Sequence, residues 1–496
     1  IGLPIRPDYW DYQWKINHEI DDYNTLVFLG LGTIDDFSVK APDDFDAEQQ
    51  ATVEQVPIIE QKTTTIGVSW KRKFKNGMGS MITSLSTNRL QNVFSRYQDN
   101  AQKSGVLFQN DSYEQETKLR FQTQHYLEEW KLAVGTNIQH SDYGNDTQSV
   151  LYNLDYSSGI DFIKYGFFAK AERKFLEDNL GLSFGFRVDA DSFSEGSSLM
   201  DNFSPRLALT YNLTEDQTWK INTSVGRYYK IPTYTMLGFQ NTQKRFVNKN
   251  AKYTQSDHLV MGLEYAPGNA SRITLEGFYK KYSQYPISLI DEVSLANKGG
   301  GFEVLGNEAI SSDGKGKSYG MEALYQQKLS KNFYGVFAYT YFHSQFTTVQ
   351  GDYLPSVWDS RHLISFSGGY KLKRNWEISA RWRFSGKTPY VPINQSETLA
   401  AYPEVVLDYS QLGNKKLAPF NLADIRFDKK WNFKRYSFNF YFEIQNFLAQ
   451  SIPRPDEYGL DRTEDGTMVL PRNLVKVNAE ENNNIPIPSF GLVIDF

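Results

Sequence analysis

Side chains that usually carry catalysis or bind metals are few in this sequence and stand far apart. The six histidines are His18, His125, His140, His258, His343 and His362, and no neighbouring pair has the spacing of metal ligands. Cysteine is absent, which removes disulfides, thiolate metal sites and cysteine nucleophiles together. We therefore predict no enzyme activity, no catalytic residue, no cofactor and no metal centre. His258 and His362 are interpreted as structural, whereas His343, near a predicted strand end, is a candidate ligand contact.

Two acidic stretches and one glycine run bind ions in other sequence contexts. Residues 43–48 and 461–466 offer the carboxylate oxygens that Ca²⁺ prefers, but neither stretch has the ligand spacing of an EF-hand loop. The glycines after Lys298 precede no predicted helix, so they do not indicate a phosphate-binding loop. We interpret the acidic stretches as solvated surface and the glycine run as a mobile loop.

Aromatic side chains make up 15% of the chain, and their positions suggest two roles. Tryptophan and tyrosine favour the headgroup level of a membrane because their rings are apolar with one polar edge. Tryptophans near predicted strand ends are therefore expected as interfacial anchors: Trp10, Trp219, Trp358, Trp376 and Trp431. Aromatic residues in predicted long loops are candidate ligand contacts, with packing inside the loop as the alternative: Tyr234, Phe239, Tyr285, Tyr390 and Tyr402.

The elements that must position these residues are strands, because apolar and polar residues alternate along most of the chain. In the last stretch, Phe490, Leu492, Ile494 and Phe496 alternate with small or polar residues. A wholly apolar face opposite a polar one over about ten residues matches a tilted strand that crosses a bilayer. No apolar run is long enough for a transmembrane helix. The mean hydropathy of −0.53 is compatible with a barrel, since only alternate residues face lipid.

The opposite faces of these strands carry charge. The alternation predicts the following residues as lumen-lining: Lys118, Arg120, Arg187, Asp189, Glu377, Arg381, Arg383 and Glu443. One interpretation is a solvated inner wall, and the other is an electrostatic lining for a polar or anionic solute. The two interpretations are compatible with each other.

The chain is predicted to be all-β, a transmembrane antiparallel up-and-down β-barrel with about 19 strands present. Tight turns alternate without exception with long loops, which include residues 35–61 and 92–111. All tight turns then lie at one end and all long loops at the other, as in outer-membrane barrels with short periplasmic turns. A soluble β-sandwich array does not need this asymmetry. A mitochondrial-type barrel has the same raw strand number, but its loops are not one-sided.

The net charge, the first residues and the strand number narrow the class of protein further. The net charge is −5, so the chain lacks the basic face that nucleic acid requires. The first residues have no basic start, no apolar core and no initiating Met, so they are not a signal peptide, and we expect a mature or trimmed chain. Single-chain bacterial barrels have even strand numbers. We therefore expect an odd number of strands to be missing before Ile1.

Several motifs, taken together, resemble TonB-dependent outer-membrane receptors. They follow one another over roughly the last three fifths of the chain: Ser204-Pro205-Arg206, Ser224 with Gly226 and Tyr229, the segment from His258 to Tyr282, Gly316 with Glu322, Tyr339-Thr340-Tyr341, and Asp359-Ser360-Arg361-His362. Phe496 resembles the terminal aromatic residue by which such barrels are recognised for outer-membrane assembly, with Phe490, Leu492 and Ile494 on the same face. Residues 4–17 resemble receptors of the Bacteroidota group.

The resemblance implies a barrel of the 22-stranded type, of which residues 1–496 would supply strands 4–22, without the plug domain. It implies import of a scarce nutrient (siderophore, haem, cobalamin, peptide or glycan) through a plug-gated lumen in the outer membrane of a Gram-negative bacterium. The implied partners are outer-membrane lipid, the TonB system through the missing plug, and the barrel-assembly machinery, with a surface lipoprotein or another outer-membrane subunit as a further candidate. The alternative is a receptor-like barrel that acts as a binding or scaffold subunit of a larger outer-membrane complex, and a passive porin is a weaker hypothesis.

The final strand leads to a structural expectation. A strand edge does not stay open toward lipid, because its backbone groups would have no hydrogen-bond partners. The closing strand should pair with the first strand of the barrel, which this sequence lacks. We therefore expect either another polypeptide at that edge or a gap beside residues 486–496.

Overall fold

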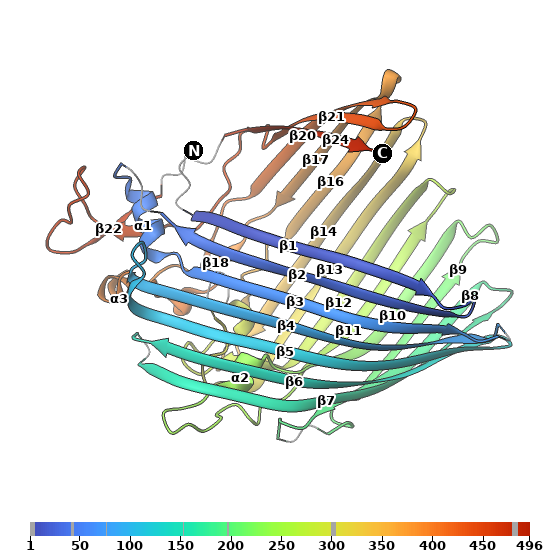
Figure 1. Cartoon of the computed structure of the whole chain (residues 1–496), viewed down its shortest axis with the longest axis horizontal. Coiled ribbons are helices and arrows are strands. Elements are labelled where there is room, and N and C mark those ends of the chain that lie inside the picture. Colours follow the sequence, from blue (N-terminus) through green and yellow to red (C-terminus); the bar gives the residue numbers. More distant parts are fainter. Residues whose placement is uncertain are drawn as a thin grey trace.

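The wall of the molecule is one 20-stranded sheet of antiparallel pairs that curls into an open barrel (Figure 1). The computed structural model describes residues 5–40, 44–75, 77–151, 153–195, 198–298, 304–478 and 485–496. One of the 20 strands, β15 (Tyr353–Pro355), has only three residues and pairs with the end of β14, beyond the part of β14 that pairs with β16. We therefore do not count it as a separate strand of the wall, and the remaining 19 strands confirm the prediction. They are β1 (Ile5–Glu19), β2 (Asn24–Val39), β3 (Ile58–Lys73), β4 (Gly79–Asp99), β5 (Ser104–Leu127), β6 (Trp130–Ser149), β7 (Leu154–Phe175), β8 (Leu180–Asp191), β9 (Ser204–Asn212), β10 (Trp219–Lys230), β11 (Thr254–Tyr265), β12 (Ser271–Ser288), β13 (Ile310–Ser330), β14 (Phe333–Thr347), β16 (His362–Lys371), β17 (Trp376–Ser385), β20 (Phe420–Asn432), β21 (Ser437–Gln445) and β24 (Ile487–Asp495).

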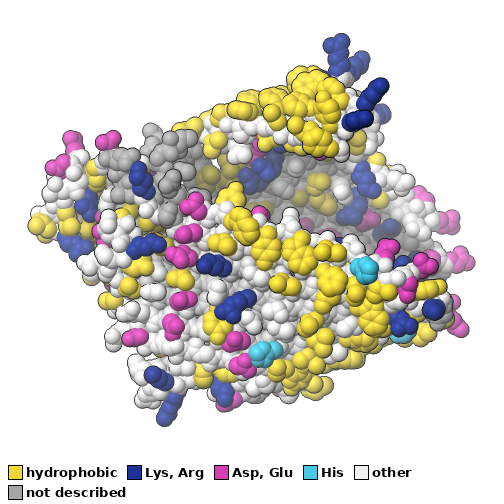
Figure 2. Space-filling model, in the orientation of Figure 1, with side chains coloured by type: hydrophobic (Ala, Val, Ile, Leu, Met, Phe, Trp, Pro, Cys, Tyr) yellow, Lys and Arg dark blue, Asp and Glu magenta, His cyan; other side chains and the backbone are white. Residues whose placement is uncertain are grey.

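The strands near the C-terminus have the length that a tilted membrane crossing needs. β16 and β17 have 10 residues each, and β21 and β24 have 9 each, against about 9–11 for a crossing. Along β24 the apolar side chains are exposed, with Phe490 at 76% and Leu492 at 60%. Figure 2 shows hydrophobic side chains gathered on the upper hairpins and on part of the front wall. Exposed apolar surface of this extent is typical of a face that meets lipid.

The prediction of a long loop at residues 92–111 is wrong. β4 and β5 pair as one ladder up to a turn at residues 100–103, and β6 and β7 pair as far as Ser149 and Leu154. β5 has 24 residues, about twice the length of a membrane crossing. The outer parts of these strands are mostly polar, so they lack the apolar alternation, but backbone hydrogen bonds and polar cross-strand pairs still hold the ladder. The predicted alternation of tight turns and long loops therefore has exceptions.

Apart from these exceptions, long loops gather at one end of the sheet and tight turns at the other (Figure 1). Trp219, Trp376 and Trp431 stand at strand ends beside tight turns, as predicted, whereas Trp10 lies inside β1 and Trp358 in the loop before β16. The connections carry α1 (Ala47–Gln55), α2 (Tyr234–Gly238), α3 (Gln395–Ala401), three short 3-10 turns, namely η1 (Leu295–Asn297), η2 (Lys373–Asn375) and η3 (Tyr409–Gln411), and the strand pairs β18 (Pro389–Tyr390) with β19 (Lys415–Lys416) and β22 (Tyr458–Leu460) with β23 (Leu474–Lys476). None of the helices in the described residues is long and apolar enough to cross a membrane.

The buried apolar clusters of the described residues involve the long loops. One cluster joins the outer parts of β6 and β7 to α2 and the residues after it: Tyr143, Ile160, Phe162, Tyr234, Leu237 and Ala251. The other joins three different loops: Val293, Val357, Val391 and Leu412. The loops are therefore packed structures that lean on the wall at its loop end. This packing gives the loop end the fixed geometry that a binding site needs.

The wall is open on one side within the described residues. β1 is paired only with β2, and β24 only with β21, so each keeps a free edge. The two edges border an opening in Figure 1, and Figure 2 shows the hollow of the barrel through it. The gap that we expected beside residues 486–496 is present in this part of the chain.

Candidate functional site in the outer loops and the lumen wall

The charged residues predicted to line the lumen lie on β5, β8, β17 and β21, and most of them are ion-paired. The pairs and their N···O distances are Lys118–Glu116 (2.6 Å), Arg187–Asp189 (2.5 Å), Arg381–Asp424 (2.9 Å), Lys371–Glu377 (4.0 Å) and Arg426–Glu443 (3.9 Å). Arg120 and Arg383 have no ion-pair partner among the described residues. Local pairing of this kind neutralises most of the wall and fits the interpretation of a solvated inner surface.

One part of the wall is more basic than the rest. Arg120, Lys170, Arg187 and Arg206 line a cavity of about 460 Å³ on strands β5 to β10. The Arg206 guanidinium lies 4.4 Å from the ring centroid of Tyr228, so its plane is held against an aromatic face. This basic region brings several cations of the wall to one cavity. It supports the second interpretation, a lining for anionic groups, at this place.

Tyr234, a predicted ligand contact, is buried where the loop between β10 and β11 meets the wall. Its hydroxyl donates to the Glu116 carboxylate at 2.5 Å and accepts a hydrogen bond from the Lys164 ammonium. Gln139 and Ser141 lie at 3.2 and 3.0 Å from the same oxygen. The side chain is 4% exposed. These contacts fit the alternative interpretation, packing inside the loop, and a role in ligand binding stays a prediction.

The other predicted ligand residues each contact a different part of the protein. Their ring partners, with centroid distances, are Tyr156 for Phe239 (5.8 Å), Phe346 for Tyr285 (4.8 Å) and Tyr319 for His343 (5.0 Å). Tyr390 belongs to β18, and the Tyr402 hydroxyl donates a hydrogen bond to Glu54 on α1. In the described parts of the chain, no hydrogen bond or ring contact joins any two of the six. The described part of the structure therefore shows no direct contact among them, and their role in ligand binding stays a prediction.

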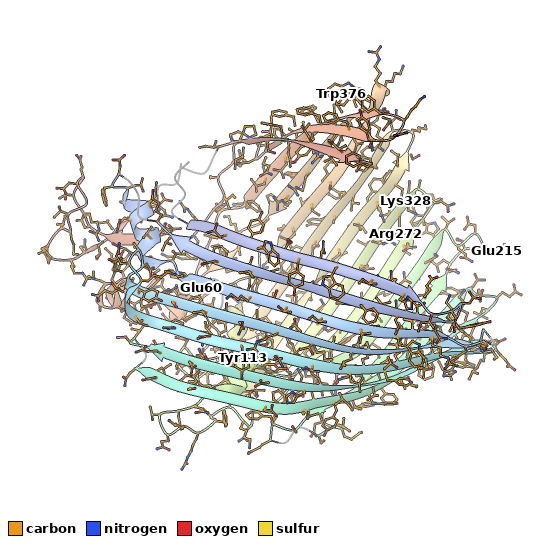
Figure 3. All side chains as sticks on the ribbon, viewed as in Figure 1. Glu60, Tyr113, Glu215, Arg272, Lys328 and Trp376 are labelled. Atoms are coloured by element: carbon orange, nitrogen blue, oxygen red, sulfur yellow. The ribbon has the colours of Figure 1, made fainter. Side chains whose placement is uncertain are left out.

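Sequence reasoning missed a cavity of about 500 Å³ at the loop end of the barrel. Its lining combines aromatic rings with amide, hydroxyl and carboxylate groups: Phe37, Phe94, Tyr143, Gln61, Asn92, Asn110, Ser112 and Glu114. The Asn110 amide donates to Asn145 at 2.5 Å and to Thr147 at 2.8 Å, which fixes its orientation. Tyr113, labelled in Figure 3, stands between Ser112 and Glu114 on β5, so its ring points away from theirs to the outer side of the wall, where its hydroxyl donates to Asp142 at 3.1 Å. Rings and fixed polar groups of this kind can stack on an organic ligand and form hydrogen bonds with it.

This outer cavity was missed because residues 92–111 were assigned to a loop. The signal was present as a polar alternation, since Asn92 and Phe94 on β4 face the same way as Asn110 and Ser112 on β5. Polar residues at a period of two indicate an exposed strand only weakly, because loops have a similar composition. The pairing of the two strands is what turns these residues into one surface.

A second set of contacts, which we call the loop clasp, joins loops from the two sides of the open wall. It consists of Glu54 and Gln55 on α1, Tyr458 and Arg462 at β22, and Tyr402 after α3. Arg462 Nη2 donates to Glu54 at 2.8 Å, Gln55 Nε2 donates to the Tyr458 carbonyl at 2.6 Å, and the Tyr402 hydroxyl donates to Glu54. Burial raises the pKa of Tyr402, and the adjacent Glu54 carboxylate raises it further. The Tyr402 phenol therefore stays protonated at neutral pH. The clasp ties loops next to both free edges together.

The ion-binding alternatives gain no support from the described residues. The described residues contain no group of three His, Asp or Glu side chains that could hold a metal ion. Arg462 and Thr463 in the acidic stretch 461–466 are engaged in hydrogen bonds within the protein. Lys298 pairs with Asp291 at 2.6 Å and Glu308 at 2.5 Å. Residue 43 and the glycines after Lys298 lie outside the described residues.

The family model described as "TonB dependent receptor-like, beta-barrel" matches residues 7–447. No curated protein matches the sequence. Among solved structures, the ferripyoverdine receptor of the outer membrane of Pseudomonas aeruginosa is 13% identical with a TM-score of 0.65, covering 99% of this chain and 65% of that one. A ferric enterobactin receptor from Pseudomonas aeruginosa is 16% identical with a TM-score of 0.66, over 99% and 69% of the two chains.

A copper transporter is similar to the same degree, with 13% identity and a TM-score of 0.66 over 100% of this chain and 73% of that one. At these identities the likeness shows a shared fold. The chain spans 65% of the length of the ferripyoverdine receptor. The family model covers the strands from β1 to β21 and ends at residue 447, before β24.

Proposed function

This chain belongs to the TonB-dependent receptor β-barrel family, and from that premise we propose that it forms the wall of an importer for a scarce nutrient. Proteins of this kind reside in the outer membrane of Gram-negative bacteria, where the exposed apolar side chains of β24 would face lipid. The nutrient classes that we consider are a siderophore, haem, cobalamin, a peptide or a glycan. The ferripyoverdine receptor and the copper transporter among the similar structures handle a ferric siderophore and copper, respectively.

The observation that carries the proposal is a wide wall of 19 strands whose loop end is a packed, polar and aromatic surface. The outer cavity would make the first contact with the ligand through its rings and fixed amides. The basic section of the lumen, around Arg120 and Arg187, would then face the ligand or the domain that fills the barrel. Nothing among the described residues favours the scaffold alternative.

The proposal includes parts beyond this chain. A plug domain would fill the lumen and connect to the TonB system, which supplies energy for import. Further strands would close the gap between β1 and β24, because lipid cannot satisfy free strand edges. The barrel-assembly machinery would recognise the last strand through the exposed residues Phe490, Leu492, Ile494 and Phe496.

Deletion of the plug-encoding segment from the full gene tests the proposal in the source organism. Cells that carry only the intact gene should take up the limiting nutrient in a TonB-dependent manner, and the deletion should abolish this energised uptake. Removal of TonB should have the same effect. Uptake that continues unchanged in the deletion strain, with the protein present in the outer membrane, would contradict the proposal.

A further inference from the structure

Charge is unevenly distributed over the tight-turn end of the wall. The turns after β5, β7 and β9 are acidic: Glu128, Glu129, Glu177, Asp178, Glu215 and Asp216. Two adjacent hairpins on another part of the same end, β16–β17 and β20–β21, carry a group of cations that we call the basic rim: Lys373, Arg374, Lys429, Lys434 and Arg435. None of the five has an ion-pair partner among the described residues. Figure 2 shows Lys and Arg side chains projecting at the upper tip of the molecule, near which Figure 3 labels Trp376.

An aromatic groove lies beside the basic rim. Trp431, Phe433, Tyr436 and Phe438 line an open groove of about 290 Å³ at the turn between β20 and β21. The rings of Phe433 and Tyr436 stack at 4.7 Å, and those of Trp431 and Phe438 lie 5.5 Å apart. Trp376, Trp431 and Phe433 are 45%, 41% and 53% exposed. The groove is therefore a shaped apolar surface that is accessible from outside the barrel.

Lys429 places a positive charge on the outward, apolar face of the wall. It stands opposite Phe440 on β21, which in turn stands opposite Leu492 on β24. Residues opposite one another in antiparallel strands project from the same face of the sheet. The ammonium lies 5.3 and 5.5 Å from the ring centroids of Trp376 and Trp431 and donates to the Arg374 carbonyl. A lysine among lipid-facing aromatics brings its charge to the headgroup level.

The chemistry of this surface fits one kind of ligand. Tight turns of outer-membrane barrels face the periplasm, so the groove lies at the level of the inner leaflet. Unpaired Lys and Arg attract phosphate, and clusters of such residues beside a membrane bind anionic headgroups. An apolar groove next to the charges offers space for an acyl chain. We propose that the basic rim and the aromatic groove together bind an anionic phospholipid of the periplasmic leaflet, with its phosphate near Lys429 and one acyl chain along Trp431 and Phe438.

The test uses the full-length protein, purified in detergent and titrated with phosphatidylglycerol or phosphatidylcholine, with bound lipid counted by native mass spectrometry. The variant K429Q/K434Q/R435Q removes three cations of the basic rim, and each should contribute roughly fivefold to affinity. We expect phosphatidylglycerol binding to weaken about 100-fold in total and phosphatidylcholine binding to stay weak. The matched control K71Q/K73Q/K75Q removes three cations at the end of β3 and in the turn that follows it, away from the aromatic groove, and should retain binding.

Two further measurements distinguish a lipid phosphate from free phosphate and show that the variants are folded. Inorganic phosphate should not displace the lipid, and Trp431→Ala should weaken lipid binding while heat-modifiable gel mobility shows an intact barrel. Equal binding of the two lipids, equal loss in both triple variants, or displacement by inorganic phosphate would overturn the proposal. So would unchanged phosphatidylglycerol binding in a folded K429Q/K434Q/R435Q protein. Replacement of the lipid by an acidic periplasmic protein at the same surface would also overturn it.

Discussion

Replacing Tyr234 with Phe removes one oxygen from the contact between the β10–β11 loop and the wall. The ring stays, so the buried apolar cluster with Phe162 and Leu237 is kept. The lost hydroxyl donates to Glu116 and accepts from Lys164. Because these partners are charged, each hydrogen bond contributes about 1.5–3 kcal/mol. We therefore expect the loop to open more easily, while the wall itself stays intact.

The net loss should be smaller than the sum of the two bonds. Glu116 keeps Lys118 at 2.6 Å and Lys164 at 3.0 Å, so its carboxylate does not become unpaired. We expect a change of about 2 kcal/mol in the free energy of loop opening, which corresponds to roughly 30-fold faster amide exchange. Hydrogen exchange of the full-length protein in detergent measures this for residues 231–253. Tyr234→Ala should have a larger effect, about 3–5 kcal/mol, because it also leaves a cavity.

The controls separate the packing role of Tyr234 from a general loss of stability. Exchange in the loop between β17 and β20, residues 386–419, should not change. Exchange in residues 231–253 that stays within twofold of the wild type would refute the reasoning, and so would an equal acceleration in every loop. If Tyr234→Phe lowers ligand affinity while exchange is unchanged, the ligand-contact prediction gains support over the packing interpretation.

Three further predictions concern the loop clasp, the last strand and a periplasmic turn. Arg462→Met leaves Glu54 without its guanidinium, which should cost about 1–2 kcal/mol locally and speed limited proteolysis of residues 453–478 roughly tenfold. Phe496→Ala should lower the assembled, heat-modifiable fraction several-fold at equal synthesis, in accord with its proposed role in assembly. Hydrogen bonds from two neighbouring threonines lower the pKa of Asp216 to about 2; because the folded pKa is depressed, the stabilisation is present above about pH 4 and is lost as the pH falls toward 2. Thermal unfolding of Asp216→Asn should therefore depend less on pH in that window. An unchanged measurement contradicts the reasoning in each case.

Much of the wall could be predicted from the sequence because strand patterning is a local property. Successive side chains of a strand point to opposite faces, so Phe490, Leu492, Ile494 and Phe496 indicate one lipid-facing surface without knowledge of any partner. The same pattern gave 19 strands, and the free edge of β24 followed from their number. Local patterning fails where both faces are polar, and for that reason residues 92–111 were assigned to a loop although they complete β4 and β5.

The candidate sites depended on the tertiary structure, because their residues are far apart along the chain. Tyr234 meets Glu116 across 118 positions, and Arg462 meets Glu54 across 408. The predicted loop aromatics were plausible one by one, but their burial and separation depend on how each loop packs on the wall. The basic rim likewise exists only because β17 and β20 pair across the long loop between them. The sequence alone therefore determined the strands and their lipid-facing side, through alternation between adjacent residues, whereas the cavities, the loop clasp and the basic rim were decided by contacts between distant segments.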